Sequence, residues 1–310
     1  MASLAPDMPG ICGHQYPFLC PFLTVVMSKQ GDTKRNAREV RHTAWVVRRT
    51  PYRDADLIIE FFTEEDGLLA AFAAGARKSR KQSGPALLTL ARLDILIRRG
   101  RGDLWHLREV TPQQVLGSVT QDYASLAAAG AALRLVRAAA REGLAEPGLF
   151  NCLCQYLSAL DSFAKSKAQS TASAPIKAPQ GTPSEDTGPR LESEERRAHG
   201  RSIDPMRSLT TAFRARLLGH LGLAPELGRC GSCGRAPRTE QRVSFEPALE
   251  ALRCRECGGG RLDLGPLERY ALRYHLERRG PLVEANTLAP LASAAHELVT
   301  TALARNGIGA

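Results

Sequence analysis

Between residues 42 and 110 the apolar positions fall in short runs separated by polar turns, a pattern typical of β-strands. The Asp66-Gly67 step between the second and third runs is a strong signal for a β-hairpin. Runs of this kind, closely spaced and joined by tight turns, predict a small β-barrel such as an OB-fold. The predicted strands are residues 44–47, 57–62, 68–74, 87–97 and 104–110. An SH3-like barrel or an open sheet has the same periodicity, so both alternatives stay open.

After Pro112 the apolar residues recur at helical spacing. The predicted helices are residues 122–141, 149–163, 206–222, 264–279 and 288–303. The interval from residue 164 to 205 holds only three large apolar residues among Ser, Thr, Pro, Gln and charged residues. Such a segment cannot bury enough surface to offset its ordering entropy, so we expect residues 164–205 to be a disordered insertion.

The first forty residues carry no pattern from which a function follows. Several prolines argue against a continuous helix there, and no Lys or Arg precedes Lys29, which argues against a secretory signal. We interpret residues 1–40 as a disordered extension or an over-called start, with Met27 as the alternative first residue. The predicted fold class is α+β multidomain, with an OB-fold at 41–118, helical parts at 119–163 and 206–310, and a zinc module at 228–260.

The overall composition narrows the class of protein. Hydrophobic residues make up 43% of the 310 residues, which is enough to form cores and excludes a wholly disordered chain. The longest apolar stretch, residues 18–27, is too short to span a membrane and contains Pro21, so we expect no membrane association. Eight cysteines are too few for a disulfide-dense scaffold, and we interpret Cys152 and Cys154 as small buried apolar residues.

Positive charge is concentrated in one part of the predicted barrel. The chain has a formal net charge of +10, and residues 77–101 alone contain eight basic residues and one acidic residue. Because each neutralised phosphate releases a condensed counterion, this density favours binding to a nucleic-acid backbone. The candidate DNA-binding residues are Arg77, Lys78, Arg80, Lys81, Arg98, Arg99 and Arg101. The alternative is a solvated loop that binds nothing.

Aromatic residues of the predicted barrel are candidates for stacking on bases, provided that their rings face outward. They are Trp45, Tyr52, Phe62, Phe72 and Trp105. For each single residue, packing in the core is the alternative.

Four of the cysteines form two CxxC pairs, Cys230 with Cys233 and Cys254 with Cys257, separated by twenty residues. Two tight turns of this kind bring four thiolates to one ion, and a tetrahedral sulfur site suits Zn²⁺. We predict one Zn²⁺ per chain, with a structural role, because four sulfur ligands leave no position for a catalytic water. A rubredoxin-like iron site and redox-active cysteine pairs remain as alternatives.

The sequence contains no recognisable catalytic motif. It has no P-loop, no GxGxxG after a strand and no HExxH, and its seven histidines are scattered. The sequence therefore predicts a binding protein and not an enzyme.

Taken together, the order of these parts resembles the RecO family of DNA repair and recombination mediators. The resemblance is carried by residues 44–56 (AWVVRRTPYRDAD), 62–67 (FTEEDG), 75–80 (GARKSR), 99–105 (RGRGDLW) and 221–227 (LGLAPEL), the last leading into the first CxxC pair. It covers roughly residues 42–162 and 206–300, and nothing is carried over to the two segments that depart from the family pattern.

The resemblance implies an OB-fold followed by a helical domain with a zinc module. It implies binding of single- and double-stranded DNA and annealing of complementary strands, in DNA repair by homologous recombination. It also implies association with RecR and with the C-terminal tail of single-stranded-DNA-binding protein, and through them the loading of RecA, in the cytoplasm and at the nucleoid. A zinc-ribbon factor of transcription or translation that binds RNA is the main alternative.

Overall fold

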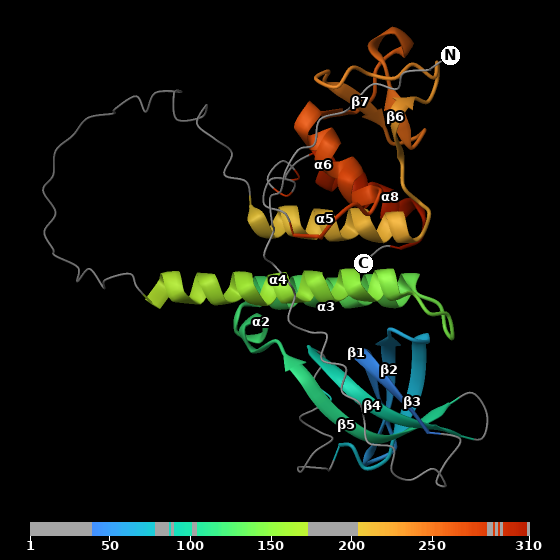
Figure 1. Ribbon diagram of the computed structural model, residues 1–310, viewed down its shortest axis with the longest axis vertical. Coiled ribbons are helices and arrows are strands. Elements are labelled where there is room, and N and C mark those ends of the chain that lie inside the picture. The colour runs from blue at the N-terminus through green and yellow to red at the C-terminus, as the bar shows by residue number, and fades with distance from the viewer. Residues whose placement is uncertain are drawn as a thin grey trace, which may run out of the picture. The chain divides into compact units, whose positions relative to one another are not determined.

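The computed structural model describes residues 39–77, 87, 90–100, 104–172, 204–283, 288, 291 and 294–308 (Figure 1). Its first elements are β1 (Glu39–Tyr52), β2 (Asp56–Thr63), β3 (Gly67–Ala73), β4 (Ala91–Arg99) and β5 (Trp105–Val115). These strands pair in the order β1-β2-β3-β5-β4, and β4 pairs back onto β1, so the sheet closes into a barrel. The predicted OB-fold is therefore confirmed, and its closure between β3 and β5 is a parallel pairing of only two residues on each strand.

Buried and partly exposed side chains alternate along the strands, and the apolar side chains on one face of each strand fill the barrel interior. Ile59, Phe61, Leu93 and Ile95 are fully buried there, together with other apolar residues of the five strands. The expected hairpin at Gly67 is present, and its φ of +63° is a conformation that glycine adopts without strain. A Cβ at Gly67 would lie 2.1 Å from the carbonyl oxygen of Leu144. The glycine therefore also allows the segment around Leu144 to pack directly against this turn.

Two prolines lie within strands, although the predicted strands 44–47 and 104–110 stop before them. Pro51 is part of β1, opposite Leu57, and at this point β1 pairs with β2 alone, so no partner requires the missing N–H on the other side. Pro112 is part of β5, next to a register shift against β4. The prediction that the fifth strand ends at Val110 was therefore wrong, because free edges and bulges tolerate proline.

The barrel is followed by helices that form a second core. They are α2 (Gly117–Gln121), α3 (Tyr123–Ala139), α4 (Pro147–Ala172), α5 (Pro205–His220), α6 (Pro266–Leu276) and α8 (Ala294–Arg305). The Asp122 carboxylate caps α3 by accepting from the N–H of Ser125 at 2.9 Å. A hydrogen bond from Lys167, at 2.6 Å, is the main reason that the pKa of Asp122 is lowered to about 2. This contact joins the start of α3 to the end of α4. None of the described helices is long and apolar enough to cross a membrane.

Helix α4 extends further than the sequence indicated. The expected insertion begins at residue 164, whereas α4 continues to Ala172. Ala164 is buried, and Lys165 forms an ion pair with Asp161 one turn earlier at 2.7 Å. Short and charged side chains with good helix propensity thus prolong the helix without a wide apolar face. The remainder of the predicted insertion, residues 173–203, and residues 1–38 of the predicted extension lie outside the described residues.

A small sheet, here called the ribbon, lies in sequence between α5 and α6. It consists of β6 (Glu226–Cys230), β7 (Val243–Glu246), β8 (Ala251–Arg253) and β9 (Leu262–Leu264), in the order β6-β8-β7-β9, with the 3₁₀ turn η2 (Arg255–Cys257) after β8. Leu227, Phe245 and Leu264 belong to the same hydrophobic cluster as the residues that pack the helices together. The ribbon is therefore anchored to the helical core and does not depend on its cysteines alone.

The outer surface of the barrel packs against the helices through two aromatic residues. Trp45 and Phe62 are fully buried and belong to the helical cluster, not to the barrel interior. The ring of Phe62 lies 5.7 Å from that of Phe150, and the indole N–H of Trp45 points to Sγ of Cys154 at 3.2 Å. These two rings are therefore not available for stacking on bases, and the core alternative holds for both.

The buried position of Trp45 leads to a prediction about stability. We expect Trp45→Ala to lower the free energy of unfolding by about 3–5 kcal/mol, because it removes a large ring from a packed interface. Tyr52→Ala, in the exposed end of the same strand, is the matched control and should cost less than about 1 kcal/mol. Urea denaturation of both variants tests this, and equal losses would show that Trp45 does not join the two cores.

Candidate functional site

The four paired cysteines lie together at one end of the ribbon. Cys230 ends β6 and Cys233 lies in the turn after it, while Cys254 directly precedes the short turn η2 and Cys257 ends it. Parallel pairing of β6 with β8 places Cys230 opposite Leu252 and so brings the two turns side by side. All four sulfur atoms lie within 4.8 Å of one another. The predicted grouping of these four residues is confirmed.

The spacing and environment of the sulfur atoms fit a metal ion. A tetrahedral Zn²⁺ with Zn–S bonds of about 2.3 Å separates its sulfur ligands by about 3.8 Å. Sγ of Cys233 and Sγ of Cys254 are 3.8 Å apart. Backbone N–H groups, first that of Cys254, lower the pKa of Cys230 to about 6 and so favour its thiolate. Hydrogen bonds with the other cysteines, first with Cys254, raise the pKa of Cys257 to about 12.

The remaining described cysteines are not part of this cluster. Cys152 is buried in α4, and burial raises the pKa of its thiol to about 12. Cys154 is half-buried under Trp45, and its pKa is also raised by burial. Both are thiols within the helical core, as the sequence indicated.

The structure describes three of the seven candidate DNA-binding residues. Arg77 is exposed at the beginning of the segment after β3, and Arg98 and Arg99 end β4. The remaining candidates, Lys78, Arg80, Lys81 and Arg101, lie outside the described residues. The structure therefore places the positions from which the two basic segments start.

Strand pairing brings these positions to one end of the barrel. Phe72 near the end of β3 is opposite His106, and His106 is in turn opposite Arg98. Arg77 lies beside the turn between β1 and β2, since its backbone N–H donates to the carbonyl of Ala55 at 2.9 Å. We call this region, with Arg53, Arg77, Arg98 and Arg99, the basic end of the barrel. The sequence left open whether the two basic segments meet, and the barrel topology brings their described parts together.

Aromatic rings lie among these cations. Tyr52 meets Phe72 edge to face at 6.0 Å, and Phe72 meets His106 in the same way at 5.7 Å. The guanidinium of Arg53 lies over the ring of Tyr52, and that of Arg99 over the ring of Trp105; each distance to the ring centre is 5.3 Å. Tyr52 is 42% exposed and so presents part of its ring to solvent.

Two members of this group, Arg53 and His106, were not among the residues predicted from the sequence. Arg53 directly follows Tyr52 and precedes Asp54, so a turn that exposes it was readable there. The position of His106 depends on the pairing of β3 with β5, which periodicity does not reveal.

Comparison with known proteins relates this arrangement to one family. A family model described as recombination protein O N terminal matches residues 37–115, and one described as recombination protein O C terminal matches residues 201–304. The first match includes the whole barrel, and the second includes α5, the ribbon, α6 and most of α8.

Curated relatives agree with these matches. The chain is 28% identical over 220 residues to the DNA repair protein RecO of Desulforudis audaxviator, with 71% of each chain covered. It is 29% identical over 222 residues to that of Anaeromyxobacter sp. strain K, again with 71% of each covered. Against that of Geobacter metallireducens it is 29% identical over 229 residues, which cover 73% of this chain and 75% of the relative. The chain, with its OB-fold, helical core and cysteine ribbon, belongs to the RecO family of DNA repair and recombination proteins.

Proposed function

We propose that this chain is a recombination mediator that binds single- and double-stranded DNA at the basic end of its barrel. The observation that carries the proposal is the convergence of Arg53, Arg77, Arg98 and Arg99 with partly exposed aromatic rings at one end of an OB-fold. Cations that contact phosphates supply affinity without reading sequence, and exposed rings offer stacking surfaces that accept any base. Binding of this kind needs no catalytic group.

Such a surface also explains how strand annealing would proceed. Two complementary strands repel each other through their phosphates, and basic side chains screen this repulsion. The resemblance to the family further implies RecR, the C-terminal tail of single-stranded-DNA-binding protein and, indirectly, RecA as partners. The names of the relatives, which speak of DNA repair, support the wider process.

We propose that Cys230, Cys233, Cys254 and Cys257 hold one Zn²⁺. Four thiolates suit this ion and would leave no position for a reacting water, so the ion would stabilise the two turns of the ribbon. The nearby backbone N–H groups would orient and stabilise the thiolates in the same turns.

The zinc site gives a prediction for Cys233→Ser. We expect this variant to lose stoichiometric zinc and to melt at a lower temperature, because the binding energy of a structural ion is folding energy. The control is Cys152→Ala, which should lower the melting temperature through a cavity while it retains the zinc. Metal analysis and thermal melting distinguish the two, and stoichiometric zinc in a chain that lacks all four paired cysteines would contradict the assignment.

Neutralising the basic end should change how DNA binding depends on salt. We expect Arg98→Ala with Arg99→Ala to weaken binding to all sequences alike and to reduce the log–log salt slope by up to about 2, one per lost phosphate contact. The control is Arg134→Ala with Arg207→Ala, which removes the same charge from exposed positions on helices. Titration of labelled single-stranded DNA at several salt concentrations measures both the affinity and the slope.

The adjoining segment allows a second version of this experiment. Replacing Lys78, Arg80 and Lys81 by Ala should reduce the slope by up to about 3 and slow annealing, with the zinc content unchanged. If both sets of variants kept the affinity and slope of the unaltered chain, these cations would form only a solvated surface.

Stacking can be separated from charge by means of Tyr52. We expect Tyr52→Ala to weaken binding of single-stranded DNA by about 1–3 kcal/mol with an unchanged salt slope, because a ring is lost and no cation is removed. Tyr123→Ala provides the control, since Tyr123 is 85% exposed but lies on α3. Loss of affinity in both variants, or in neither, would argue against a stacking surface at the basic end.

A further inference from the structure

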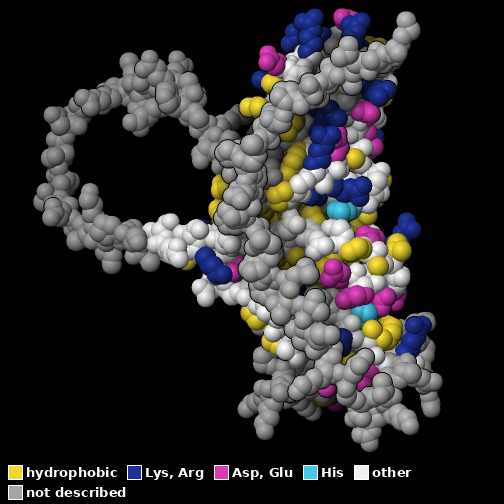
Figure 2. All heavy atoms as spheres, viewed as in Figure 1, with side chains coloured by type: hydrophobic (Ala, Val, Ile, Leu, Met, Phe, Trp, Pro, Cys, Tyr) yellow, Lys and Arg dark blue, Asp and Glu magenta, His cyan; other side chains and the backbone are white. Residues whose placement is uncertain are grey.

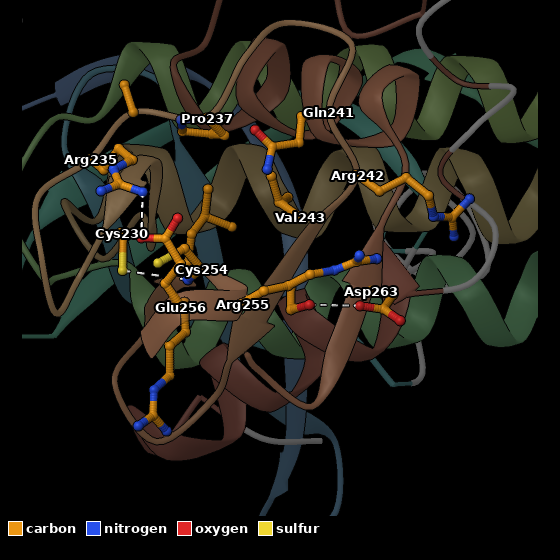
Figure 3. A pocket seen from close by; sticks show the side chains of 14 residues that line it. Cys230, Arg235, Pro237, Gln241, Arg242, Val243, Cys254, Arg255, Glu256 and Asp263 are labelled. Carbon is orange, nitrogen blue, oxygen red and sulfur yellow. Dashed lines mark hydrogen bonds and ion pairs between the residues drawn. The ribbon is translucent and has the colours of Figure 1, made fainter. Parts of the chain in front are cut away.

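A cavity of about 270 Å³ opens on the ribbon beside the cysteine cluster (Figure 3). Cys230 and Cys254 contribute to its wall, whereas Cys233 and Cys257 do not. Figure 3 shows Arg235 and Arg242 on opposite sides of this cavity. The cavity belongs to the ribbon alone and includes no residue of the barrel.

Charge is distributed unevenly around the ribbon. Residues 226–264 contain seven arginines and six acidic residues, so the ribbon as a whole is almost neutral. Four of the arginines line the cavity, but only two of the acidic residues do, Glu256 and Asp263. Both acidic side chains already have partners, since Glu256 pairs with Arg235 at 2.5 Å and Asp263 accepts from the hydroxyl of Ser244 at 2.7 Å.

The other three arginines of the cavity have unused donors. Arg242 precedes β7, whereas Arg253 and Arg255 lie on either side of Cys254, at the end of β8 and the start of η2, so they come from two segments. No hydrogen bond or ion pair joins their side chains to another residue within the described ranges, and Nε of Arg253 is buried without a partner. On the face seen in Figure 2, Lys and Arg side chains also recur over the part of the molecule with β6, β7 and α6.

We propose that this cavity is a second nucleic-acid site, which binds backbone phosphates of a DNA strand through Arg242, Arg253 and Arg255. Unpaired guanidinium groups are suited to phosphate oxygens, and the distribution of three of them over two segments of the cavity wall suits successive phosphates of a strand better than one small ion. The inference rests on the proposed DNA-binding function and adds to it a site on a different module from the barrel.

The test compares two double variants of the full chain. Arg242→Ala with Arg255→Ala should weaken binding of a labelled single-stranded oligonucleotide and lower its log–log salt slope by up to about 2. Arg229→Ala with Arg238→Ala removes the same charge from exposed residues of the ribbon outside the cavity and should leave the slope unchanged. Repeating the titration with added inorganic phosphate, at matched ionic strength, distinguishes a strand from a free anion. If the salt slopes of the unaltered chain and of the Arg242 and Arg255 double variant still differ when phosphate is present, the cavity binds the strand.

Metal analysis of every variant shows whether the arginines act only on the thiolates of the cluster. Arg242→Glu alone is the second variant, because Arg242 is distant in sequence from both cysteine pairs. An unchanged slope in both cavity variants would overturn the proposal, whether or not zinc is lost, and so would abolition of the slope difference by inorganic phosphate. If only the Arg98 and Arg99 variant loses affinity for DNA, the proposed barrel site is upheld and the proposed cavity site is refuted. If only the cavity variants lose affinity, the cavity site is upheld and the barrel site is refuted. If the unaltered chain does not bind DNA, both proposed sites are refuted.

Discussion

The short parallel pairing between β3 and β5 determines where the candidate DNA-binding groups lie. It closes the barrel by placing Ala71 opposite Trp105 and Phe72 opposite His106. Because β5 also pairs with β4, the same contact aligns Phe72, His106 and Arg98 across three strands. Without this contact the sheet would be open, with β3 at one edge and β5, next to β4, at the other, and the basic segments that follow β3 and β4 would not meet.

A second constraint is the continuity of the apolar core outside the barrel. Trp45 and Phe62 cover one part of the outer barrel surface and pack against the helices, and the ribbon contributes Phe245 and Leu264 to the same cluster. The aromatic residues of the barrel are thereby divided by location. Trp45 and Phe62 hold the modules together, whereas Tyr52 and Phe72 lie among the cations of the basic end.

The sequence was informative where a local pattern determines the structure. Strand alternation, the Asp66-Gly67 hairpin and the CxxC spacing each depend on a few neighbouring residues, and each prediction is confirmed. Features that depend on pairing between residues far apart in the sequence could not be predicted from it. Pro112 is accepted in β5 because of a register shift against β4, and His106 joins the basic end only through β3. The extension of α4 to Ala172 relies partly on Lys167, which reaches Asp122 at the start of another helix.

The central claim is that DNA lies across the basic end of the barrel, in contact with its rings. Photocrosslinking of the full chain to a single-stranded oligonucleotide that contains bromodeoxyuridine, followed by mass spectrometry of the linked peptides, tests this contact directly. The account predicts adducts on peptides that contain Tyr52, Phe72, His106 or Trp105, since these rings lie among the cations. Efficient crosslinking confined to peptides of the helices, with none from the barrel, would contradict it.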